Sequence, residues 1–258
     1  MHSINAQSVA FSRARILYDA SRLRNPSQEL FTREYWAQRN ALKEVSGGRN
    51  AVFFLRAEAD PQARRWVLRH YRRGGLMAKI VEDRYLWLGE SRTRAFAEWR
   101  LLAELHRRGL PVPAPVAARY VRSGLAYRAD LITEELPASR TLADLMTPPA
   151  AAMMADQWLA IGRTIARFHL QGVHHADLNA HNILIGSDAA VYLLDFDRGC
   201  IRARGAWEQR VLARLRRSLA KISQQRSARF GEEEWRVLMD GYAVANADSN
   251  PDSPASAP

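Results

Sequence analysis

Runs of apolar residues with the length and composition of β-strands occupy the first half of the chain. Residues 14–19, 51–56 and 65–71 are rich in β-branched and aromatic side chains and are bounded by turn-forming residues. Residues 120–122 and 127–133 have the same character on either side of a Ser-Gly turn. The pattern predicts a series of short strands joined by turns.

The apolar spacing changes to a helical period after residue 92. Residues 92–108 repeat apolar side chains at three- and four-residue intervals, and Gly109 follows as a helix stop. Further helices are predicted at residues 32–40, 141–146, 152–170, 206–224 and 232–242. Helices are therefore expected to dominate the second half of the chain.

Strands before about residue 135 and helices after it predict an α+β protein with two lobes. The expected domains are a strand-rich N-lobe at residues 1–135 and a helical C-lobe at residues 136–245. Residues 246–258 are small and polar with no apolar stripe, which predicts a disordered tail.

One polar segment between two predicted strands has a spacing that is typical of kinases. It reads His-Ala-Asp-Leu-Asn-Ala-His-Asn from His175 to Asn182, and an apolar run then ends at Asp195. In an H-x-D-L-x-x-x-N loop the aspartate meets the attacking hydroxyl, while the asparagine and a later aspartate bind magnesium. We interpret Asp177 as the catalytic base, Asn182 and Asp195 as metal ligands, and His175 as a support for the loop backbone. A plain polar turn is the alternative.

The nucleotide side of such a site is less sharply defined by the sequence. Gly47 and Gly48 lie in a turn between predicted strands, where they either close over phosphates or form a plain hairpin turn. Kinases pair a basic residue on a strand with a glutamate on the next helix. Arg69 and Lys79 are both candidates for the basic residue. Glu98 is either their partner or a solvent-facing helical residue.

Two further segments are candidates for ligand contact. Glu134, Glu135 and Leu136 occupy the predicted link between the lobes, where backbone groups can bind adenine. Residues 202–221 gather seven basic side chains around an apolar stripe headed by Trp207. That helix either presents an interfacial or anion-binding face, or packs in the C-lobe and leaves its charges in water.

The balance of charges adds one consideration. The formal net charge is +11, and 35 of the 38 basic residues are arginine. Either a coding bias has replaced lysine by arginine, or the protein meets an anionic partner such as a nucleotide, phospholipid, lipopolysaccharide or nucleic acid. Cys200 is the only cysteine, which excludes an intrachain disulfide. With no membrane-spanning run and no signal peptide evident, we expect a protein made and kept in the cytoplasm.

Several stretches are similar to a known family. The segments His174–Leu184, Leu194–Gly199 and Trp66–Leu76 resemble 3-deoxy-D-manno-octulosonic acid (Kdo) kinases. These are lipopolysaccharide core kinases related to protein kinases, so a protein-kinase-like fold is expected. Residues 95–102 and 31–36 resemble the same family, and the likeness covers nearly the whole chain except the tail.

The resemblance implies ATP-dependent phosphorylation of the 4-hydroxyl of Kdo on Kdo–lipid A, with ATP and Mg²⁺ as cofactors. It places this work at the cytoplasmic face of the bacterial inner membrane, with the protein peripheral on an anionic surface. The resemblance gives the family's site roles directly to Asp177, Asn182 and Asp195. It extends to Arg69 as part of a matching stretch. No A-P-E segment follows Asp197, which argues against a protein substrate. We infer neither a nucleic-acid partner nor an obligate protein partner.

Other functions stay open on the sequence. One is a heptose kinase of the lipopolysaccharide core, or a small-molecule kinase of the aminoglycoside or choline type. Another is a pseudokinase that acts as a membrane-associated binding protein, which the arginine at position 69 motivates. The presence of Asp177, Asn182 and Asp195 together argues against a pseudokinase.

Overall fold

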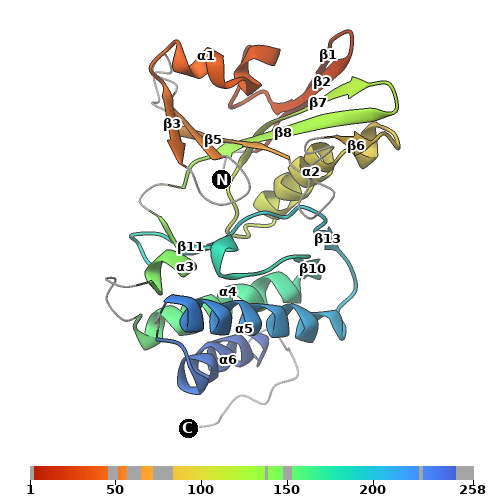
Figure 1. The fold of residues 1–258 in the computed structure, drawn as a ribbon. Helices are drawn as coiled ribbons and strands as arrows, with labels where there is room; N and C mark the ends of the chain where they lie inside the picture. Colours follow the sequence, from red (N-terminus) through yellow and green to blue (C-terminus); the bar gives the residue numbers. More distant parts are fainter. Residues whose placement is uncertain are drawn as a thin grey trace. The chain divides into compact units, whose positions relative to one another are not determined.

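The computed structural model describes residues 3–45, 52–56, 65–71, 84–136, 139–147, 153–226 and 229–247. The chain divides into two compact units (Figure 1). The N-terminal unit comprises residues 1–109 and 113–135, and the C-terminal unit comprises residues 110–112 and 136–258. Residues 110–112 are expected in the N-lobe but belong to the C-terminal unit. The backbone nitrogen of Leu193 in that unit donates to the carbonyl oxygen of Pro111 at 3.1 Å.

An antiparallel sheet forms the centre of the N-terminal unit (Figure 1). Among the described residues it has eight strands, in the order β1-β2-β7-β8-β5-β4-β3, with β6 paired to β8. The strands are β1 (Ala6–Ala10), β2 (Ala14–Asp19), β3 (Leu42–Val45), β4 (Val52–Arg56), β5 (Arg65–His70), β6 (Tyr85–Leu86), β7 (Pro115–Ser123) and β8 (Ala126–Glu134). The strands and the hairpin expected from the apolar pattern are therefore confirmed.

The apolar pattern does not predict β3 or β6, and β1 and β7 also differ from the expectation. The pattern does not reveal β1 because its residues are nearly all exposed, so this edge strand is defined by its pairing with β2. Strand β7, which pairs with the other side of β2, begins at Pro115 instead of residue 120. A proline is tolerated at the first position of a strand, and a register irregularity follows it between Pro115 and Ala117.

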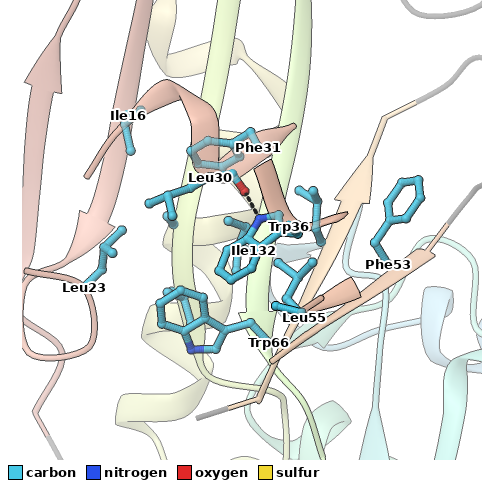
Figure 2. Close-up of a cluster of buried hydrophobic side chains, with 13 residues drawn as sticks. Ile16, Leu23, Leu30, Phe31, Trp36, Phe53, Leu55, Trp66 and Ile132 are labelled. Atoms are coloured by element: carbon cyan, nitrogen blue, oxygen red, sulfur yellow. Dashed lines mark hydrogen bonds between the residues drawn. The ribbon is translucent and has the colours of Figure 1, made fainter. Parts of the chain in front are cut away.

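Aromatic residues from two short helices pack on this sheet. The helices are η1 (Gln28–Phe31) and α1 (Arg33–Ala37), which is shorter than the helix expected there. Figure 2 shows their side chains beside those of the strands, and the buried cluster includes Leu30, Phe31, Trp36, Leu55, Trp66 and Ile132. The indole nitrogen of Trp36 donates to the carbonyl oxygen of Leu30 at 2.8 Å, so this buried polar atom has a partner.

Three long helices dominate the C-terminal unit (Figure 1): α4 (Ala155–Leu170), α5 (Trp207–Arg226) and α6 (Glu232–Ala247). Helix α5 buries an apolar stripe from Trp207 to Ile222 and exposes most of its basic residues. The interpretation of that stripe as a packed helix is therefore confirmed. No helix in the described part of the chain is long and apolar enough to cross a membrane.

The last helix extends further than expected. The sequence predicts a disordered tail from residue 246, but α6 continues through Asn246 and Ala247. The side-chain amide of Asn246 donates to the carbonyl oxygen of Tyr242 at 2.8 Å and accepts from Arg204 at 3.0 Å. These bonds compensate for the weak helix propensity of asparagine. The remaining residues of the predicted tail lie outside the described part of the chain.

Short strands in the C-terminal unit frame the polar loop. Strand β11 (Ile183–Ile185) lies between β9 (Arg140–Thr141) and β12 (Val191–Leu193), and β9 leads into α3 (Leu142–Leu145). Strand β10 (Val173–His174) pairs with β13 (Cys200–Ile201). The predicted catalytic loop runs from β10 to β11 and ends in the short helix η4 (Ala180–Asn182). Its C-terminal end is therefore adjacent to the strand that leads to Asp195.

Helices α4 and α6 approach each other through their backbones. A Cβ atom on Gly162 would lie 1.9 Å from the carbonyl oxygen of Leu238, and one on Gly241 would lie 2.3 Å from that of Leu159. Each glycine thus faces a carbonyl group of the partner helix, which cannot move aside as a flexible side chain would. The small residues determine how closely these two helices pack.

Gly162→Ala is expected to lower the free energy of unfolding by about 1–3 kcal/mol, because the added methyl group must push α6 away from α4. Denaturant titration measures the change. Gly205→Ala is the control, since a Cβ there would meet no atom within 4 Å, and its effect is expected to stay within about 0.5 kcal/mol. Wild-type stability of the Gly162 variant would contradict the close helix contact.

Candidate active site

One buried histidine supports both parts of the predicted catalytic centre in the C-terminal unit. His175 is 3% exposed. Its Nε2 atom lies 2.7 Å from the carbonyl oxygen of Leu194, and its Nδ1 atom lies 3.2 Å from the backbone nitrogen of Asp177. Together these two bonds require a neutral ring with its proton on Nε2. Burial lowers the pKa of His175, which favours this neutral form.

The imidazole ring of His175 packs against an aromatic side chain. Phe196 follows Asp195 in the chain and is 1% exposed. Its ring centroid lies 4.7 Å from that of His175 and 5.7 Å from that of Phe168, against which it is stacked. The apolar contacts keep water from the imidazole and so maintain the low pKa on which its two hydrogen bonds depend.

The carboxylate of Asp177 is accessible, whereas its backbone is held. The side chain is 61% exposed. The carbonyl oxygen of Asp177 accepts hydrogen bonds from the side-chain amides of Asn179 and Asn182, at 2.9 and 3.0 Å. A fixed backbone with a reachable carboxylate is the arrangement that a base for an incoming hydroxyl requires.

A cation that sequence reasoning did not single out contacts this carboxylate. Arg214 of α5 donates from Nη1 to Oδ1 of Asp177 at 2.8 Å. Helix α5 also reaches the loop through Ser218, whose hydroxyl oxygen accepts from the backbone nitrogen of Ala180 at 3.2 Å. In the sequence Arg214 is one of seven basic residues in its segment, and only folding distinguishes it from the others.

Asn182 and Asp195 stand at adjoining ends of β11 and β12. The backbone nitrogen of Leu194 donates to the carbonyl oxygen of Asn182 at 2.9 Å, one step beyond the paired residues of the two strands. Asp195 then adopts a left-handed conformation with φ 60°, which aspartate tolerates better than most residues do. The bonds of Leu194 to Asn182 and His175 hold the chain where this turn begins.

The oxygen atoms of these two residues suit a hard divalent cation. The amide nitrogen of Asn182 is engaged by Asp177, which leaves its Oδ1 as an acceptor, and Asp195 supplies a carboxylate. Mg²⁺ commonly takes one or two protein oxygens and completes its coordination with water and nucleotide phosphates. Within the described ranges, no group of three or more His, Cys, Asp or Glu side chains forms a metal cage. The oxygens of Asn182 and Asp195 therefore fit the one or two ligands that a protein commonly supplies to Mg²⁺.

The N-terminal unit contains a separate buried ion pair. Arg69 of β5 pairs with Glu98 of α2 (Arg94–Arg107), and the hydroxyl of Tyr71 also donates to the Glu98 carboxylate. The side chain of Glu98 is 2% exposed and that of Arg69 is 18% exposed. Glu98 is therefore not a solvent-facing helical residue, and its carboxylate is paired with Arg69.

The predicted adenine segment has contacts of its own. The Glu134 carboxylate accepts from Nε of Arg22 at 2.9 Å, and Arg22 also pairs with the buried Asp19. No sequence signal pointed to Arg22, which lies 112 residues from Glu134. The carbonyl oxygen of Leu136 accepts from the hydroxyl of Ser139 at 2.9 Å.

Three further residues predicted to contact nucleotide lie outside the described ranges: Gly47, Gly48 and Lys79.

Comparison with known proteins identifies the family. A family model described as the lipopolysaccharide kinase (Kdo/WaaP) family matches residues 33–242. The chain belongs to this family. The kinase therefore has the α+β, protein-kinase-like fold that its sequence predicts.

Relatives of this kinase carry the name 3-deoxy-D-manno-octulosonic acid kinase. The protein of Stenotrophomonas maltophilia (strain K279a) is 44% identical over 234 residues, which cover 89% of this chain and 90% of the relative. That of Xanthomonas campestris pv. campestris (strain B100) is 45% identical over 231 residues, with the same coverage of 89% and 90%. That of Photobacterium profundum is 40% identical over 239 residues, covering 92% and 98%.

Arg69→Met is expected to destabilise the kinase by roughly 3–5 kcal/mol, because it leaves the Glu98 carboxylate buried without its cation. Denaturant titration measures the loss. The double variant Arg69→Met/Glu98→Gln is expected to recover most of the stability, since the unpaired charge is gone. Phosphate transfer that stays low in the recovered variant would assign the pair a role beyond stability. A double variant as unstable as the single one contradicts this account.

Proposed function

We propose that this kinase transfers the γ-phosphoryl group of ATP to the 4-hydroxyl of Kdo on Kdo–lipid A. One observation carries the proposal: a single neutral histidine holds both the backbone of Asp177 and the strand end before Asp195. Asn182 lies at the adjoining strand end. Relatives of 40–45% identity that are named 3-deoxy-D-manno-octulosonic acid kinase support the choice of acceptor.

In the proposed reaction Asp177 takes the proton of the acceptor hydroxyl as its oxygen attacks the γ-phosphorus. A new phosphorus–oxygen bond forms, the bond to the β–γ bridging oxygen breaks, and ADP leaves. The exposed carboxylate of Asp177 is accessible to a hydroxyl of a bulky glycolipid. Asn182 and Asp195 would hold Mg²⁺, which when bound offsets the charge of the phosphates.

On the nucleotide side, we assign Arg69 to the phosphates, where kinases use a strand lysine. Its planar guanidinium can bind two phosphate oxygens at once, which a lysine cannot do. Glu98 and Tyr71 fix the position of this side chain. In the same proposal Gly47 and Gly48 cover the phosphates, Lys79 is the alternative cation, and backbone groups at Glu134 and Leu136 meet the adenine.

We further propose that the kinase is peripheral at the cytoplasmic face of the bacterial inner membrane. The net charge of +11 and the exposed arginines of α5 support this proposal. Basic residues close to an anionic bilayer each contribute about 1 kcal/mol of attraction. Such a surface would concentrate the kinase where a lipid-linked acceptor is found.

Phosphate transfer from radiolabelled ATP to Kdo–lipid A in vesicles, with magnesium, is the first measurement. Wild-type transfer is expected, and Asp177→Ala should lower turnover by at least about a hundredfold because a general base is lost. Asp240→Ala is the matched control. Asp240 is also exposed and also pairs with an arginine, Arg236, at 2.8 Å, but it lies on α6. Its turnover should equal that of the wild type.

The outcomes of this assay separate the alternatives. Near-normal turnover of the Asp177 variant removes this residue from the mechanism. Transfer only to heptosylated core or to small alcohols would assign another kinase activity, and ATP binding without any turnover would indicate a binding protein. Faster transfer on vesicles of anionic than of zwitterionic phospholipid, with a difference that salt reduces, is expected for the membrane proposal. Equal rates would refute it.

Asp195→Ala is expected to abolish magnesium-dependent transfer, since it removes the charged oxygen ligand proposed for Mg²⁺. Titration of the wild type with a chelator should abolish transfer likewise, and added magnesium should restore it. A magnesium titration curve that is the same in wild type and variant would count against Asp195 as a ligand. Thermal unfolding of both proteins shows whether the loss reflects the site or the fold.

A further inference from the structure

The guanidinium of Arg214 touches the candidate base without a part in the proton transfer. The two groups are 2.8 Å apart, and their side chains are 50% and 61% exposed. An exposed arginine–carboxylate pair contributes only about 0–1 kcal/mol to stability. Stability therefore gives little reason for a cation at this position.

Arg214 must lie beside the acceptor when the acceptor is bound. The attacking hydroxyl has to come within about 2.6–3.2 Å of an oxygen of Asp177. Arg214 donates a hydrogen bond to Oδ1 of the same carboxylate, so its guanidinium is a close neighbour of that hydroxyl. Among the described residues Arg214 makes this one hydrogen bond, which engages a single one of the five N–H donors of a guanidinium.

Positive charge continues along α5 beside the catalytic loop. Arg210 lies one turn before Arg214 and Arg217 lies one turn after it on the same face, and both are exposed. An anionic acceptor would therefore meet favourable charge along this face as well as at Arg214.

The proposed acceptor carries the group that such a cation recognises. Kdo is a sugar acid, and its carboxylate is ionised at neutral pH. A guanidinium presents two parallel N–H donors whose spacing matches the two oxygens of a carboxylate. A neutral sugar has no group of this charge and shape to offer.

We propose that Arg214 selects an acidic sugar as acceptor by binding its carboxylate while Asp177 holds the attacking hydroxyl. This inference rests on the proposed function. It makes Arg214 a specificity-determining residue, so that a sugar acid is phosphorylated well and a neutral sugar of the same shape is phosphorylated poorly.

Two acceptors that differ only in this group test the proposal. They are Kdo–lipid A and the same lipid with the Kdo carboxyl group reduced to an alcohol, both in neutral detergent micelles. The wild-type kinase is expected to prefer the acid by about 10- to 100-fold in kcat/KM, as expected for hydrogen bonds to a charged group. Arg214→Gln should lose most of this preference, through a higher KM for the acid and little change for the alcohol.

Arg216→Gln is the matched control. Arg216 is exposed on the same helix to a similar extent, 45%, but it pairs with Glu232 instead of the catalytic loop. This variant is expected to keep the preference of the wild type.

Each contrary outcome has a distinct meaning. An equal loss on both acceptors shows that Arg214 only holds Asp177, and no loss on either shows a mere surface pair; both overturn the role of Arg214. Equal wild-type rates on the two lipids also overturn it, while the proposed function stands. A wild-type kinase that phosphorylates neither lipid refutes the proposed function, and this inference with it.

Discussion

A single neutral imidazole, that of His175, supports the backbone segments on which the candidate catalytic residues stand. It donates from Nε2 to Leu194 and accepts at Nδ1 from the backbone of Asp177. A protonated ring would present a second donor to the Asp177 N–H group and lose that bond. The site therefore depends on burial of the ring, because burial lowers its pKa and keeps it neutral.

This dependence links the core of the C-terminal unit to its chemistry. Phe196 packs on His175 and Phe168, and it directly follows Asp195 in the chain. The same apolar contacts thus exclude water from the imidazole and anchor the residue after the left-handed turn at Asp195. A strained backbone conformation persists when its surroundings determine it, as they do at this candidate site residue.

The ion pairs Arg69–Glu98 and Arg214–Asp177 differ in their physical character. Arg69 and Glu98 are mostly buried, so neither can lose its partner without leaving a charge in a poorly solvated place. Arg214 and Asp177 are about half exposed, so water and solutes compete for both. The first pair suits a fixed structural element, and the second suits a contact that a substrate can share.

Local patterns in the sequence were enough to predict five strands of the N-terminal sheet (β2, β4, β5, β7 and β8), the long helices and the spacing of the catalytic loop, because apolar period and chain order are local properties. They also indicated Asp177, Asn182 and Asp195, which one loop and one strand end carry. Folding was needed to show that Arg69 pairs with Glu98, 29 residues away, and that Arg214 contacts Asp177, 37 residues away. The same holds for the exposed edge strand β1, which is defined by pairing. These contacts depend on which distant segments share a buried surface, and no local pattern encodes that choice.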